Sequence, residues 1–154
     1  MKISVGSDHA GYNYKSKIIE LAGSIGHTAI DVGTNSTGSV DYPDYGEKGA
    51  QLVACKKADM AILICGTGIG MSLAANKVSG IRAAVCWNTE TAFLARQHNH
   101  ANVLCLSARF LSEEECIKIV KVFINAPESS EERHVRRVKK IMAIEERNKT
   151  FEKR

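Results

Sequence analysis

Short apolar segments bounded by turn residues recur five times between residues 2 and 106. Each is rich in β-branched or other apolar side chains, which is typical of buried strands. The segments cover residues 2–6, 28–32, 59–65, 82–86 and 102–106. Because longer stretches separate them, we expect parallel strands joined by crossover helices.

The intervening stretches have apolar residues at helical spacing. In residues 12–25 these positions include Ile18 and Leu21, and Gly26 predicts the helix end. Residues 44–56, 69–76 and 89–98 follow the same rhythm. Ser112 and Glu115 have the spacing of a capping box, which predicts a helix that ends near residue 125. Pro127 separates it from a last, strongly charged helix, which we predict from residue 131 to about 148.

This alternation predicts an α/β fold, a Rossmann-like or flavodoxin-like three-layer sandwich with a five-stranded parallel sheet covered on both faces. We expect one domain over residues 1–154, with a C-terminal helical extension and tail over residues 128–154. In the strand order 2-1-3-4-5, the switch point lies between the first and third strands. A ligand is then expected beyond the carboxyl ends of those two strands.

The loop after the third strand joins a thiol to three glycines, in the sequence I-C-G-T-G-I-G over residues 64–70. Small residues let backbone N–H groups approach an anion, and the next helix adds its positive end, so a Cys65 thiolate would be stabilised there. The pattern lacks the dinucleotide fingerprint and the P-loop lysine. Taken alone, this loop is equally compatible with a turn that only lets the helix pack on the strand, next to an inert cysteine.

Three other clusters carry polar chemistry. Asp8 and His9 follow the first strand and supply a carboxylate and an imidazole, although a helix-capping Asp8 is the alternative. Residues 98–102 gather polar groups at a helix end, where we interpret His100 as a capping residue. Arg133 and Arg137 lie one helical turn apart and could clamp a phosphate, or form a solvated basic face.

Composition narrows the class of protein. The chain is 44% hydrophobic but has no apolar run long enough for a membrane span, and it begins directly with a predicted strand. Its five cysteines lack metal-ligand spacing, which favours reduced thiols and no metal site. Much of the net charge of +4 lies in residues 133–154, and aromatic residues do not alternate with the basic ones as they do in many nucleic-acid-binding segments. We therefore expect a cytoplasmic enzyme or binding protein that has no nucleic-acid or membrane partner.

Several motifs together resemble the type B ribose-5-phosphate isomerases and their relatives, the galactose-6-phosphate isomerase subunits. They are S-D-H-A-G at 7–11, D-Y-P at 41–43, I-C-G-T-G-I-G at 64–70, A-A-N-K at 74–77, G-I-R-A at 80–83, R-Q-H-N at 96–99 and R-H at 133–134. The resemblance runs from residue 2 to about 147 with the motifs in the same order. It implies cofactor-free aldose–ketose isomerisation of a phosphorylated sugar by a homodimer or a dimer of dimers.

The resemblance also implies roles for individual residues. Cys65 would be the base that abstracts the proton next to the carbonyl, and His98, with Asp8 and Thr67, would open the furanose ring. Some relatives instead use a carboxylate on the following helix, where this chain has Ala74, Ala75 and Asn76, and that departure favours Cys65. The implied substrate-binding residues are His9, Tyr42, Gly66, Gly68, Ile69, Gly70, Asn99, Arg109, Arg133 and Arg137.

The chemistry fits these roles, because enediolisation needs one base and a set of fixed donors, and no redox cofactor. We expect conversion of ribose 5-phosphate to ribulose 5-phosphate, a step of the pentose phosphate pathway. The alternatives are a galactose-6-phosphate or allose-6-phosphate isomerase, or a non-catalytic domain that binds a phosphosugar or nucleotide. Topology places His98 and Cys65 at opposite sheet edges, so we expect His98 and Asn99 to reach the Cys65 loop of a two-fold partner.

Overall fold

All five predicted strands are present, in one parallel sheet. The structure is a computed structural model that describes residues 1–151, with side chains described to residue 148, so the end of the predicted tail lies outside the described residues. The strands are β1 (Lys2–Ser7), β2 (Thr28–Asp31), β3 (Met60–Cys65), β4 (Ala83–Val85) and β5 (Val103–Ser107). Each differs from its predicted bounds by one or two residues.

The strand order is β2-β1-β3-β5-β4, so the predicted order 2-1-3-4-5 is wrong in its last two places. Every residue of β5 is buried, whereas β4 has three half-buried residues. A strand buried on both faces belongs inside a parallel sheet, and a short, half-exposed strand suits its edge. The switch point between β1 and β3 is as predicted, and the carboxyl ends of β1, β3 and β5 lie side by side through the pairs Ser7–Ile64 and Cys65–Ser107.

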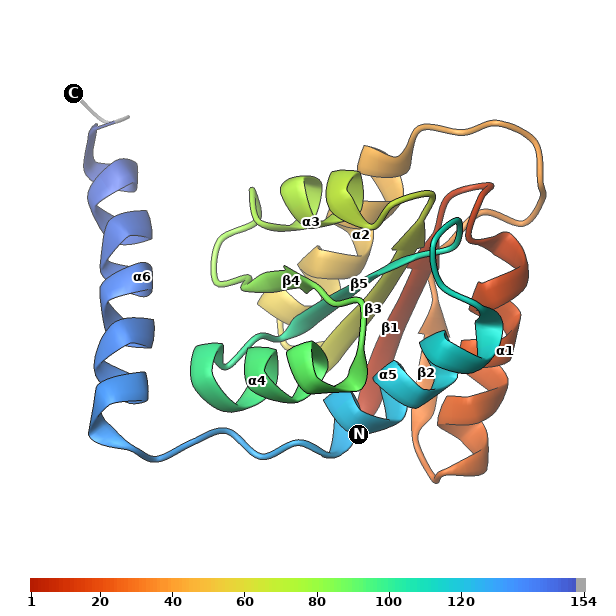
Figure 1. Cartoon of the computed structure of the whole chain (residues 1–154). Helices are drawn as coiled ribbons and strands as arrows, with labels where there is room; N and C mark the ends of the chain where they lie inside the picture. The colour runs from red at the N-terminus through yellow and green to blue at the C-terminus, as the bar shows by residue number, and fades with distance from the viewer. Residues whose placement is uncertain (152–154) are drawn as a thin grey trace.

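Helices cover both faces of the sheet (Figure 1). They are α1 (Tyr12–Ser24), α2 (Tyr42–Ala54), α3 (Ile69–Ala75), α4 (Thr89–Asn99), α5 (Glu113–Asn125) and α6 (Glu132–Phe151). The apolar stripes of α1, α4 and α5 pack in one core cluster around Ile62 and Leu104. Those of α2 and α3 pack in a second cluster around Leu63 and Cys105 on the other face. The three-layer arrangement predicted from the sequence is therefore confirmed.

Local signals account for the helix ends. The Ser112–Glu115 capping box is present, since each side chain bonds the backbone of the other. Gly26 adopts a left-handed φ of 80° directly after the end of α1, as expected of a C-terminal glycine. The helix α2 begins two residues earlier than predicted, because Pro43 is accommodated in its first turn.

The charged helix α6 stands beside the sandwich, joined to α5 by the extended segment 126–131 (Figure 1). It contacts α4, and its buried side chains are His134 and Val138 among those described. No helix in the described part of the chain is long and apolar enough to cross a membrane.

Candidate active site

The Cys65 thiol ends β3 and is held by the turn that follows. Its Sγ atom accepts a hydrogen bond from the backbone N–H of Gly68 at 3.1 Å. Gly68 has a left-handed φ of 77°, and a Cβ there would lie 3.1 Å from the backbone of Leu106. Both the conformation and the close approach therefore require glycine. The hydrogen bond fixes the sulfur against the glycine turn.

The loop after β1 lies against this turn. The Asp8 N–H donates to the Ile64 carbonyl at 3.2 Å, one residue before Cys65. The buried Asp8 carboxylate accepts from the N–H groups of Ala10 and Gly11 at 2.9 and 3.2 Å through Oδ1. These bonds close the turn before α1, whose N-cap is Gly11 without a side-chain cap, so the helix-capping alternative for Asp8 is wrong. The catalytic role of Asp8 stays a prediction.

The His9 imidazole accepts a hydrogen bond at one ring nitrogen, which leaves the second nitrogen as a donor. Its Nδ1 atom accepts a hydrogen bond from the Val40 N–H at 3.2 Å. A neutral imidazole that accepts at Nδ1 carries its proton on Nε2. His9 can therefore donate from Nε2 to an anion bound beside the glycine loop.

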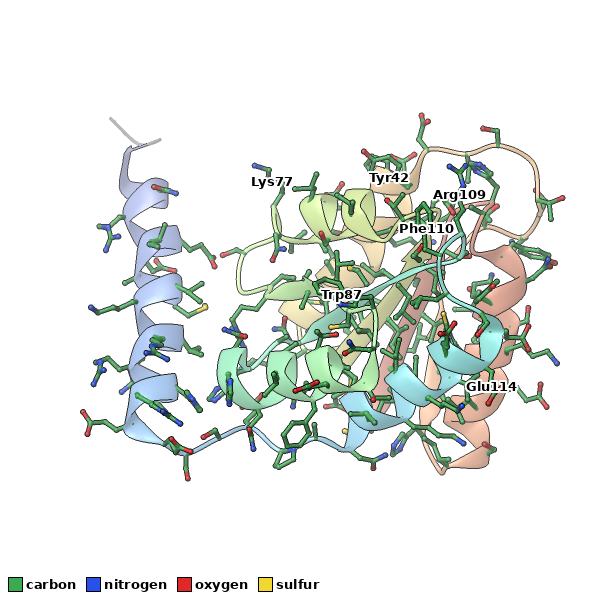
Figure 2. All side chains as sticks on the ribbon, viewed as in Figure 1. Tyr42, Lys77, Trp87, Arg109, Phe110 and Glu114 are labelled. Carbon is green, nitrogen blue, oxygen red and sulfur yellow. The ribbon has the colours of Figure 1, made fainter. Side chains whose placement is uncertain are left out.

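Arg109 and Tyr42 close over the glycines from neighbouring elements. The Arg109 N–H bonds the Gly66 carbonyl at 3.1 Å, and its Nε atom lies 3.0 Å from where a Gly66 Cβ would stand. The Tyr42 ring lies over Gly70, with Cε2 2.6 Å from the position of a Cβ there. Figure 2 shows both side chains at the carboxyl end of the sheet, and both are exposed. One chain thus brings a thiol, backbone donors, a guanidinium and a phenol together.

Thr67 and Ile69 complete the loop. The Thr67 hydroxyl accepts from the Ile69 N–H at 3.2 Å, which fixes the turn before α3. The Ile69 side chain is 56% exposed, so only its backbone takes part in the turn. The roles of these residues toward substrate stay predictions.

His98 and Asn99 lie at the other edge of the sheet. They are in the last turn of α4, which ends before β5 begins at Val103, whereas Cys65 pairs with the last residue of β5. The four residue-to-residue steps along β5, at about 3.3 Å each, separate the two ends of this strand by about 13 Å. His100 is the α4 C-cap, as predicted, in a left-handed conformation with φ 48°.

Arg133 and Arg137 are on the exposed surface of α6, away from the Cys65 loop of the same chain (Figure 1). Arg133 pairs with Glu131 at 2.8 Å. Within one chain the predicted site residues therefore form two groups, one near the carboxyl ends of the strands and one near their amino ends.

Sequence reasoning missed His134, whose ring stacks on His98 with centroids 4.0 Å apart. In this helix only Arg133 and Arg137 were assigned roles from the sequence. The available signal was the spacing of His134, Val138 and Ile141, which marks one helical face. Burial of the His134 ring, and next the His98 imidazole, lowers the His134 pKa.

The other buried thiols are poor acids. Burial raises the pKa of Cys86 to about 11 and that of Cys116 to about 12, and it raises the pKa of Cys105 well above the usual thiol range. These three cysteines are core residues. The described residues contain no cluster of three or more side chains suited to hold a metal ion.

Known proteins are similar to this chain over most of its length. A sequence model of the Ribose/Galactose Isomerase family matches residues 3–141. Ribose-5-phosphate isomerase B of Escherichia coli is 44% identical over 146 residues, which cover 95% of this chain and 97% of that protein. A probable ribose-5-phosphate isomerase B of Mycoplasma pneumoniae is 46% identical over 144 residues, 93% of this chain and 94% of that one.

Solved structures match equally well. Ribose-5-phosphate isomerase B of Clostridium thermocellum superposes with a TM-score of 0.93 at 47% identity, covering 96% of this chain and 99% of that chain. The enzyme from Mycoplasma genitalium with bound ribulose 5-phosphate has a TM-score of 0.89 at 43% identity, with 94% and 96% coverage.

Proposed function

The chain belongs to the ribose/galactose isomerase family, and we propose that it interconverts ribose 5-phosphate and ribulose 5-phosphate, a step of the pentose phosphate pathway. The observation that carries the proposal is the Cys65 thiol under the Gly68 N–H, at the switch point, with Arg109 and Tyr42 over the same loop. This arrangement supplies a base and fixed anion donors in one place.

The reaction begins with the furanose form of the aldose. The ring opens when the hydroxyl on C1 loses a proton and the ring oxygen gains one. We assign this transfer to His98, assisted by Asp8 and Thr67. An imidazole suits the step because it accepts and donates protons near neutral pH.

Isomerisation then moves one proton between neighbouring carbons. The Cys65 thiolate takes the proton from C2, and the C1 carbonyl oxygen becomes an enediolate oxygen. The N–H groups of Gly66 and Gly70 donate to this oxyanion, while those of Gly68 and Ile69 hold the turn through Cys65 Sγ and the Thr67 hydroxyl. The Cys65 thiol then returns its proton to C1, and the proton of the C2 hydroxyl moves to the C1 oxyanion. This gives the C1 hydroxyl and C2 carbonyl of the ketose and restores the thiolate. No electrons leave the sugar, so the step uses no redox partner.

The phosphate and hydroxyl contacts come from both residue groups. We assign the phosphate to His9, Arg109, Arg133 and Arg137, and sugar hydroxyls to Tyr42 and Asn99. Because one chain holds these residues at opposite sheet edges, we propose a homodimer, alone or as a dimer of dimers, with shared sites. Each site combines the Cys65 loop of one subunit with His98, Asn99, Arg133 and Arg137 from the other.

A substrate comparison tests the proposed function. Purified protein is incubated with ribose 5-phosphate, allose 6-phosphate and galactose 6-phosphate, and kcat/KM is measured for each. We expect the highest value with ribose 5-phosphate. A higher value with a six-carbon substrate would reassign the chain to that isomerase activity, and phosphosugar binding without turnover would identify a non-catalytic domain.

A further inference from the structure

The segment that leads into α6 is fastened along the last turn of α4. The Ser129 N–H donates to the Gln97 carbonyl at 3.0 Å, and the Ser129 carbonyl lies 3.0 Å from Nε2 of His100. Arg96 bonds the Glu128 carboxylate at 3.0 Å and the Ala101 carbonyl at 2.7 Å through the same nitrogen. Residues 128–129 are therefore a fixed connection, and the start of α6 is placed relative to His98.

The first turn of α6 then sets one imidazole on another. The His98 and His134 rings have centroids 4.0 Å apart and are tilted by 39°. His134 is 3% exposed, and its Nδ1 atom is buried without a hydrogen-bond partner among the described residues. An unpaired buried polar atom costs stability that an apolar ring would not. The His134 ring is therefore held here by its contact with His98 and not by a hydrogen bond at Nδ1.

We propose that His134 is a positioning residue for ring opening. Its ring holds the His98 imidazole in one orientation and fixes α6 in register with the end of α4. Arg133 and Arg137 then keep a constant placement relative to His98 and Asn99. This inference rests on the proposed role of His98 in opening the furanose ring. Groups that act electrostatically on His134 are Glu131, Arg133 and Arg137 from α6 and the segment before it, besides His98 from α4.

The test isolates ring opening from isomerisation. In a Cys65→Ala background, exchange between the α and β anomers of ribose 5-phosphate reports ring opening alone, and magnetisation-transfer NMR measures its rate. His134→Ala and His134→Phe are added to this background. Val138→Ala is the matched control, because Val138 is buried one turn further along the same helix.

We expect the Cys65→Ala protein to accelerate anomer exchange. His134→Ala should reduce that acceleration about 10- to 100-fold, since misplacement of a catalytic group by about 1 Å has losses of this order. His134→Phe keeps a ring against His98 and should restore most of the rate, and Val138→Ala should change it less than about threefold. In the protein with Cys65 intact, His134→Ala should also raise the KM for ribose 5-phosphate several-fold.

Three results would overturn the inference. His134→Ala with full anomer exchange would show that His98 needs no support from this ring. An equal loss in Val138→Ala would assign the effect to general docking of α6. If Cys65→Ala itself fails to accelerate exchange, the proposed ring-opening step fails, and the role of His134 fails with it. Circular dichroism of each variant checks that the fold is retained.

Discussion

The sulfur of Cys65 and the backbone N–H of Gly68 are joined by a 3.1 Å hydrogen bond across the turn between β3 and α3. The bond ties the proposed base to the loop that would hold the enediolate. Any change that moves this loop therefore moves both the base and the oxyanion donors.

Replacing Cys65 by Ala should lower kcat by about 10²- to 10⁴-fold, because general-base catalysis contributes about that much. Cys65→Ser should be nearly as slow, since it keeps the size and loses the acidity. Steady-state kinetics and circular dichroism measure activity and fold. Cys55→Ala, an exposed thiol at the end of α2, is the control and should be fully active. Near-normal kcat in Cys65→Ala would assign the base to another residue.

Iodoacetamide at pH 8 should separate the thiols into two classes. The raised pKa values of Cys86, Cys105 and Cys116 keep them protonated and unreactive in the folded protein. Labelling should be fastest at the exposed Cys55 and slower at Cys65, which is 4% exposed at the end of β3, as read by mass spectrometry of peptides. Saturating ribose 5-phosphate should slow the labelling of Cys65 and leave Cys55 unchanged. Equal protection of both would count against a ligand at the Cys65 loop.

Gly70→Ala should disturb substrate binding through Tyr42. The new Cβ would stand 2.6 Å from the Tyr42 ring, and this exposed ring can move away. We expect KM to rise several-fold while thermal stability is kept, because alanine favours the helical backbone. In a Tyr42→Ala background the same substitution should have little further effect. Additive effects on KM would show that Gly70 acts independently of the ring.

The strands and helices followed from apolar periodicity and turn residues, because local preferences and burial agree over most of this chain. The position of β4 at the edge of the sheet could not be predicted in this way, because periodicity identifies a strand but not the strands that pair with it. Cys65, Asp8 and His9 were brought together by the switch-point argument and by the family resemblance. His134 was missed because its function depends on a contact between α4 and α6, which no local pattern in the sequence records.

Substitution of Arg133 or Arg137 by Ala should raise the KM for ribose 5-phosphate and weaken competitive inhibition by inorganic phosphate. These arginines would bind a group remote from the reacting carbons, so kcat falls only if that binding orients the sugar. Lys139→Ala, an exposed cation elsewhere on α6, is the control. Unchanged kinetics in the Arg133→Ala/Arg137→Ala variant would make this cluster a solvated basic surface.

Mixed dimers should recover activity that neither parent has. Cys65→Ala and His98→Ala chains are unfolded, mixed in equal amounts and refolded together. Random pairing makes half of the dimers hybrid, each with one intact site of two, so activity should approach about a quarter of the unmodified level. Separately refolded chains are the control. Absence of recovery, with hybrid dimers confirmed by mass spectrometry, would place His98 and Cys65 in one subunit's site.

The strand order β2-β1-β3-β5-β4 also sets the sequence in which the sheet can assemble. Within the described residues, β5 is the only strand that pairs with β4, and β5 comes later in the chain. While the protein is being synthesised, β1, β2 and β3 can pair as soon as they emerge, but β4 must wait until β5 has docked on β3. The segment from β4 through α4, which carries His98, is therefore the last part of the sheet layer to become ordered. In the proposed dimer, the part of the site that α4 contributes would form only after the thiol loop is already in place.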